Sequence, residues 1–140
     1  MRLFIITLLV SLGLNLQSQS LSSYKWKNRL IVFVGEMNKE NQKRLEAYNG
    51  SIPDLKERKL IFLHLTNTTV SELLPNAKPI LQDIESYQFL KKKHPERSIF
   101  LIGLDGGIKQ KTDILFQPEE LFKIIDAMPM RASEIRRKNE

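Results

Sequence analysis

The sequence contains no cysteine in its 140 residues. This absence excludes disulfide bonds, a lipid anchor on an N-terminal cysteine, and every mechanism that needs a thiolate. Histidine is also scarce, since His64 and His94 are the only two, and their spacing from the carboxylates resembles no metal site or catalytic triad. We therefore expect neither a metal nor another cofactor. The sequence also has no internal repeat and no low-complexity segment.

The first twenty residues have the pattern of a secretory signal peptide. Arg2 supplies a positive charge, residues 3–16 are mostly apolar, and residues 18–20 place serines at the two positions that a signal peptidase recognises. The apolar run is shorter than the roughly 20 residues of a membrane-spanning helix. We therefore predict a cleaved signal over residues 1–20 and one exported domain, periplasmic or secreted, over residues 21–140, with no transmembrane segment after cleavage.

The chain is basic, with 22 lysines and arginines against 16 acidic residues and a formal net charge of +6. Removal of the predicted signal would take away one arginine and leave about +5. This balance favours a protein partner, an anionic polymer or a lipid surface. Nucleic acid is disfavoured, because the positive charges are scattered and an exported chain rarely meets it. The C-terminal segment, residues 130–139, is predicted to be a basic amphipathic tail and a candidate anion-binding or membrane-binding element. Its cations are Arg131, Arg136, Arg137 and Lys138.

An apolar run without alternation, Leu30–Val34, predicts a strand that is covered on both faces and therefore lies in the middle of a sheet. Asn38 is a good N-cap for a helix over residues 39–48, with Gly50 and Pro53 after its end. A second apolar strand is predicted over residues 59–65. Two buried strands joined by a helix indicate a parallel unit with a right-handed connection.

The second half of the chain continues this alternation. Residues 67–79 are predicted to be a loop, and a helix is expected over residues 80–93. A third strand over residues 98–104 and a fourth over residues 108–112 flank Asp-Gly-Gly, a strong hairpin signal. A third helix is expected over residues 118–128. This order predicts an α/β, thioredoxin-like fold with a four-stranded mixed sheet in the order second, first, third, fourth strand, three main helices and a short C-terminal helix.

The turn after the first strand is the predicted position of a site, because α/β folds place their chemistry at the carboxyl ends of such strands. This turn contains no thiol, no histidine and no glycine pattern for phosphate. We interpret it as one side of a binding groove. The candidate residues are Trp26, Gly35, Met37, Asn38 and Arg97. For Trp26 the more common role of a lone tryptophan beside a strand is a lid on the core.

Three segments resemble a known family. Residues 24–29 read Tyr-Lys-Trp-Lys-Asn-Arg, residues 101–109 read Leu-Ile-Gly-Leu-Asp-Gly-Gly-Ile-Lys, and residues 121–131 read Leu-Phe-Lys-Ile-Ile-Asp-Ala-Met-Pro-Met-Arg, followed by Glu134 and two arginines. They resemble small exported bacterial proteins known only as domain-of-unknown-function family number 4174. That family is similar to the peroxiredoxin-like domain of vertebrate secreted sushi-repeat proteins and of a secreted coiled-coil-domain protein. The resemblance implies a thioredoxin-like fold and no established activity.

Two functions are compatible with these observations. The first is an exported, redox-inactive thioredoxin-like module that binds a protein or an anionic partner, because the positions that hold a reactive thiol in peroxiredoxins have none here. The second is an enzyme that needs no cysteine, a hydrolase or a metal-assisted catalyst, which would use His64 or a carboxylate. The neighbours of His64 in sequence offer no carboxylate to orient it, so we interpret it as a hydrogen-bonded core or edge histidine.

Overall fold

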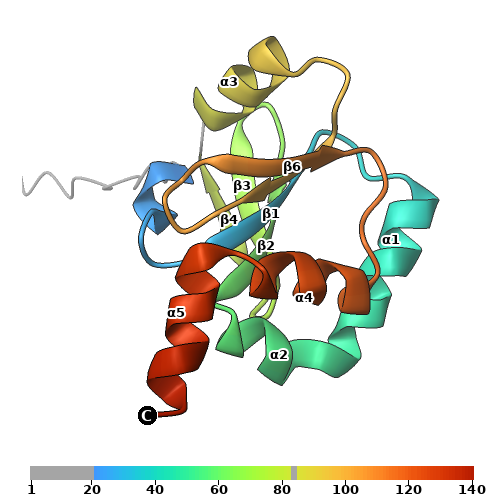
Figure 1. Cartoon of the computed structure of the whole chain (residues 1–140). Helices are drawn as coiled ribbons and strands as arrows, with labels where there is room; N and C mark the ends of the chain where they lie inside the picture. Colours follow the sequence, from blue (N-terminus) through green and yellow to red (C-terminus); the bar gives the residue numbers. More distant parts are fainter. Residues whose placement is uncertain (1–20, 83–84) are drawn as a thin grey trace, which may run out of the picture.

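The protein is an α/β domain built on one mixed six-stranded sheet in the order β4-β3-β2-β1-β5-β6 (Figure 1). This computed structural model describes residues 21–82 and 85–140. The predicted signal peptide, residues 1–20, lies outside the described residues. The strands are β1 (Arg29–Val34), β2 (Leu60–Leu65), β3 (Thr69–Leu74), β4 (Lys78–Gln82), β5 (Ile99–Ile102) and β6 (Ile108–Thr112). The helices are η1 (Leu21–Tyr24), α1 (Lys39–Glu46), η2 (Ala47–Ser51), α2 (Ile52–Glu57), α3 (Glu85–Lys93), α4 (Pro118–Asp126) and α5 (Pro129–Lys138).

The strand β1 is central, as its apolar run predicted. All six of its residues are buried. It pairs in parallel with β2 and antiparallel with β5, so that Ile31 lies opposite Phe62 on one side and Leu101 on the other. Its side chains alternate between the two faces of the sheet, which is why the run contains no polar position. The sequence therefore predicted correctly the position of this strand.

The two faces of the sheet are covered by different helices (Figure 1). Tyr48, Leu55, Leu121 and Ile125 bring η2, α2 and α4 onto the face that includes Ile31 and Phe33. The opposite face is covered by α3 through Leu90, with partly buried side chains of η1 beside it. A hydrophobic residue buried on this scale contributes about 1.5–3 kcal/mol, so these contacts fix which helix lies on which face.

The predicted loop over residues 67–79 is wrong, and so is the count of four strands. The structure has β3 and β4 there, which form a hairpin that extends the sheet beyond β2. In β3 the burial alternates, with Val70, Glu72 and Leu74 buried, and the hydrophobic pattern did not show this alternation because Glu72 is polar and Leu73, which lies between two buried residues, is apolar. Pro79 was interpreted as a loop residue. It lies in β4, an edge strand, where the missing N–H is tolerated.

Several element boundaries also differ from the prediction. The first helix ends at Glu46, and the chain continues through η2 into α2, which the sequence analysis missed. Pro53 was expected to end a helix, but it lies in the first turn of α2, where a proline loses no hydrogen bond. The helix expected from residue 80 begins at Glu85, because residues 78–82 form β4. The order of the four strands that were predicted, β2-β1-β5-β6, is present within the larger sheet.

Candidate functional site

The turn after β1 is held by its own hydrogen bonds. Gly35 has a φ of +82°, donates its N–H to the Leu65 carbonyl at 2.8 Å, and accepts a bond from His64 Nε2 at 2.6 Å. The Asn38 side chain caps α1 by accepting from the Asn41 N–H at 2.8 Å. The predicted groove residues Gly35 and Asn38 therefore have structural roles, since each satisfies a backbone group at the end of an element.

Arg97 lies near the start of α1. Its Nη1 is 3.1 Å from Asp113 Oδ2, and the Asp113 carbonyl accepts from Asn41 Nδ2 at 3.0 Å. Asn41 is buried and also accepts the Leu115 N–H at 2.9 Å. The structure thus connects Arg97 through Asp113 to the helix that follows the predicted groove. Met37, also predicted for this groove, is half-buried and packs against the core.

Trp26 does not belong to that groove. Its backbone N–H donates to the Leu104 carbonyl at 2.6 Å, at the amino end of β1, whereas Gly35 follows the carboxyl end. Six residues of strand separate the two ends by about 20 Å. The side chain of Trp26 is 60% exposed, with Lys25 Nζ 5.8 Å from its ring centroid. The interpretation of Trp26 as a lid on the core is therefore wrong.

His64 lies in β2, an interior strand, and is half-buried. Its ring binds the Gly35 carbonyl, and among the described residues no carboxylate forms a hydrogen bond or ion pair with it. The interpretation as a hydrogen-bonded histidine is confirmed. The described ranges also contain no group of three or more acidic or histidine residues that could hold a metal ion.

The predicted basic tail is largely occupied by internal contacts. Arg131 is 4% exposed, and its guanidinium binds Asp126 Oδ1 at 3.0 Å, Glu57 Oε1 at 3.1 Å and Glu134 Oε2 at 3.4 Å. Burial lowers the pKa of Arg131, but the hydrogen bonds that its guanidinium donates to these three carboxylates outweigh it and raise the pKa above its usual value. Arg131 is thus not available to an external anion.

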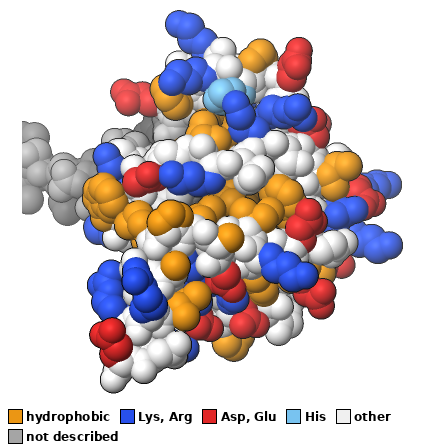
Figure 2. All heavy atoms as spheres, viewed as in Figure 1, with side chains coloured by type: hydrophobic (Ala, Val, Ile, Leu, Met, Phe, Trp, Pro, Cys, Tyr) orange, Lys and Arg blue, Asp and Glu red, His pale blue; other side chains and the backbone are white. Residues whose placement is uncertain are grey.

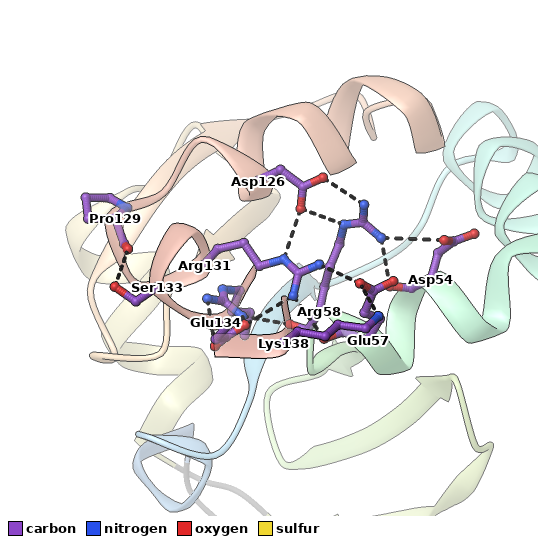
Figure 3. Close-up of polar contacts among 10 residues, drawn as sticks. Asp54, Glu57, Arg58, Asp126, Pro129, Arg131, Ser133, Glu134 and Lys138 are labelled. Atoms are coloured by element: carbon purple, nitrogen blue, oxygen red, sulfur yellow. Dashed lines mark hydrogen bonds and ion pairs between the residues drawn. The ribbon is translucent and has the colours of Figure 1, made fainter. Parts of the chain in front are cut away.

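A second buried arginine completes this cluster. Arg29 is 1% exposed, and its two terminal nitrogens face the two carboxylate oxygens of Glu134 at 3.2 and 3.3 Å. It also donates to the Arg58 carbonyl at 2.8 Å. Arg58 in turn binds both oxygens of Asp126, at 2.8 and 3.0 Å (Figure 3). We call this cluster the α5 ion network. Its members are Arg29, Glu57, Arg58, Asp126, Arg131, Glu134 and Lys138.

The other cations of the tail lie at the surface. Lys138 binds Glu57 at 3.1 Å, and this hydrogen bond, with that from Arg131, lowers the pKa of Glu57. Arg136 donates to Ser133 Oγ at 3.3 Å, and Arg137 is exposed. The tail therefore binds the rest of the domain through Arg131 and Lys138, and it presents Arg136 and Arg137 to solvent. The part of the chain that the structure describes has no helix of the length and hydrophobicity needed to span a membrane.

A basic hollow of about 590 Å³ lies between β6 and the segment that joins α3 to β5. We call it the β6 groove. Its lining residues are Lys93, His94, Pro95, Glu96, Arg97, Ile108, Lys109, Gln110 and Lys111. In Figure 2, lysine and arginine side chains gather above β6 around a histidine. Of these residues, the sequence analysis named only Arg97 as a candidate for binding, and it placed Arg97 in a groove beside the turn after β1, so it did not identify this site.

The cations of the β6 groove differ in whether they form an ion pair with an acidic side chain. Lys109 binds Asp105 at 2.9 Å and Arg97 binds Asp113, while Lys111 makes no ion pair with any described residue. The His94 ring lies on Phe100, with 5.6 Å between centroids. Partial burial first, and then the charges of Lys111 and Lys93, hold the pKa of His94 below its usual value. The two lysines thus act on the imidazole in the same direction as its burial, because both disfavour its charged form.

A smaller hollow of about 210 Å³ lies on the other side of β6, where α4 meets α5. Met128, Pro129, Met130 and Leu104 supply most of its apolar lining, and Lys109 lines both hollows. Hydrophobic side chains gather below β6 in Figure 2. We call this the apolar hollow. The two flanks of β6 therefore differ in chemistry.

Comparison with curated proteins gave no significant match. A family model described as "Domain of unknown function (DUF4174)" matches residues 20–134. The matched range contains every strand of the sheet and most of the α5 ion network, and it ends at Glu134, within α5. Because the match covers well over half of the sequence, the chain belongs to the DUF4174 family.

Proposed function

We propose that this protein is an exported, redox-inactive module with a thioredoxin-like arrangement that binds an anionic partner in the β6 groove. The observation that carries the proposal is the convergence of Lys93, Arg97, Lys109 and Lys111 around one hollow with a single acidic residue in its lining. Charges of one sign in a concave surface attract a partner of the opposite sign and hold it there.

The remaining parts of the proposal have separate support. Export is supported by the signal-like pattern of residues 1–20, and the lack of redox activity by the absence of cysteine. The thioredoxin-like arrangement is supported by the parallel β1 and β2 with helices between them, followed by the antiparallel β5–β6 hairpin and α4. The β3–β4 hairpin is then an addition at the far side of β2.

The test measures binding of inorganic polyphosphate, a polyanion without other recognition features, to the purified protein at low salt. Lys111→Glu removes a cation of the groove that forms no ion pair with any described residue, and we expect about a tenfold loss of affinity, which corresponds to about 1.4 kcal/mol. Lys56→Glu, an exposed lysine on α2, is the matched control with the same change of net charge. Equal losses in the two variants, or no binding by the native protein, would contradict the proposal.

A further inference from the structure

We propose, on the basis of the function above, that the anionic partner is an extended peptide with alternating acidic and apolar residues, and that it adds to the sheet as a seventh strand along β6. The proposal rests on three observations: the free edge of β6, the direction of its backbone groups, and the different chemistry of its two flanks. Addition of a strand to an exposed edge is a common way to bind peptides.

β6 is an edge strand, and no helix lies across it in the view of Figure 1. Its backbone directions follow from the antiparallel ladder. The Val34 N–H donates to the Ser98 carbonyl, so alternate residues of β5, Ile99 and Leu101, direct their backbone groups toward β6. Their partners on β6 are Thr112 and Gln110. Lys111 lies between these two, and its N–H and C=O therefore point away from the sheet, where an added strand would pair with them.

The flanks of β6 specify the side chains of such a strand. Lys111 lies opposite Phe100, whose side chain packs toward α3, and cross-strand partners point to the same face of a sheet. Every second side chain of an added strand would therefore enter the β6 groove, near Lys111 and His94. The side chains between them would point toward the apolar hollow at Met128 and Met130. Acidic residues fit the first position and apolar residues the second.

The lysines of β6 also select against a wrong partner. Two copies of this strand side by side would bring Lys109 and Lys111 close to the same residues of the second copy, and like charges in adjacent positions repel. An acidic strand beside β6 would instead place opposite charges next to each other, and these attract. The same lysines can thus prevent pairing between copies and favour an acidic peptide.

The test uses a synthetic peptide of about nine residues in which glutamate and valine alternate, and a control of identical composition in which the glutamates precede the valines. We expect the alternating peptide to bind at least about tenfold more tightly. Hydrogen exchange of the Lys111 amide should slow by at least about tenfold on binding, because this N–H becomes bonded. N-methylation of alternate peptide amides should abolish both effects, and it leaves the folding of the protein untouched.

A pair of protein variants tests the same contact. Lys111→Ala removes the charge, and Lys111→Pro removes the charge and the outward N–H while leaving the bonds of Gln110 and Thr112 to β5 in place. We expect the proline variant to bind the alternating peptide at least about fivefold more weakly than the alanine variant. Equal binding of the two peptides, or unchanged exchange of the Lys111 amide, would overturn strand addition. If polyphosphate still binds in that case, anion binding at the β6 groove stands, and its loss as well would refute both proposals.

Discussion

The sharpest stability prediction concerns the buried ion pair between Arg29 and Glu134. Arg29 is 1% exposed, and Glu134→Ala would leave its guanidinium with the Arg58 carbonyl as its one hydrogen-bond acceptor among the residues that the structure describes. It also removes one of the carboxylates that bind Arg131. Breaking a buried pair by removal of one partner costs about 3–5 kcal/mol, because the remaining charge stays buried without compensation. Since the Glu134 side chain is 16% exposed, we expect the lower limit, about 3 kcal/mol.

For a domain of this size about 1 kcal/mol corresponds to roughly 4 °C, so the melting temperature should fall by about 12 °C. Urea denaturation followed by circular dichroism measures the free energy of unfolding directly. Glu40→Ala is the matched control, because Glu40 and Arg44 form an exposed pair on α1, worth about 0.5 kcal/mol or less. If Glu134→Ala cost no more than Glu40→Ala, the energetic role assigned to the buried pair would be wrong.

A double variant distinguishes the energetic effect of the whole ion pair from the effect of leaving one charge without its partner. Replacing Arg29 by Met and Glu134 by Leu removes both charges and keeps apolar volume at the amino end of β1. Apolar replacements of a complete buried ion pair are often close to neutral, so the double variant should be more stable than Glu134→Ala by about 2 kcal/mol. A double variant as unstable as the single one would indicate that the pair contributes packing that methionine and leucine cannot replace.

Three further predictions follow from single sites. Lys111→Gln should raise the pKa of His94, measured by NMR titration, because a nearby positive charge is removed. Gly35→Ala should lower the free energy of unfolding by about 1–2 kcal/mol, because the φ of Gly35 is +82°. A steric clash does not contribute, since no atom lies within 4 Å of the added Cβ. Gly50→Ala has the same free space without the positive φ and should cost far less. Burial raises the pKa of Asp126, but hydrogen bonds from two arginines lower it more. Its contribution to stability is therefore complete above its usual pKa of about 4 and is lost as the pH falls through the lower folded value, so Asp126→Asn should flatten the acid side of the stability curve.

The central strand and the β5–β6 hairpin were predictable because the sequence pattern that indicates each lies within a few adjacent residues. Leu30–Val34 has no polar position, and a strand without one must be covered on both faces, whatever the rest of the chain does. The β5–β6 hairpin was equally accessible, since Gly106 has a φ of +79° and Asp105 accepts the Gly107 N–H in the turn. Both elements follow from the chemistry of a few adjacent residues.

The β3–β4 hairpin was not predictable in this way. β3 has buried side chains at alternate positions, and one of them is Glu72, which a hydrophobic pattern counts as polar. Lys78 pairs with Glu72 at 3.7 Å across the two strands, so the compensating charge comes from a residue six positions further along the chain. A pattern based on hydrophobicity therefore reads this segment as irregular, although its pairing satisfies the buried group.

The candidate site was missed for a related reason. Arg131 and Lys111 both lie in segments with several cations, yet one is buried among carboxylates and the other is exposed beside a groove. The difference is made by partners far away in sequence, since Arg131 binds Glu57, 74 residues earlier. A sequence without its contacts cannot show which positive charge is already neutralised.

The two clusters are nevertheless connected through the segment between α4 and α5. Met128, Pro129 and Met130 line the apolar hollow, and this segment lies between Asp126 and Arg131, which bind each other at 3.0 Å. The α5 ion network therefore holds one wall of the hollow in place beside β6. Residues of this network that do not contact a binding partner can therefore affect its binding, because the position of the apolar wall depends on the buried charges behind it. We therefore expect the ion pair of Asp126 and Arg131 to affect the proposed site by holding the apolar wall in position.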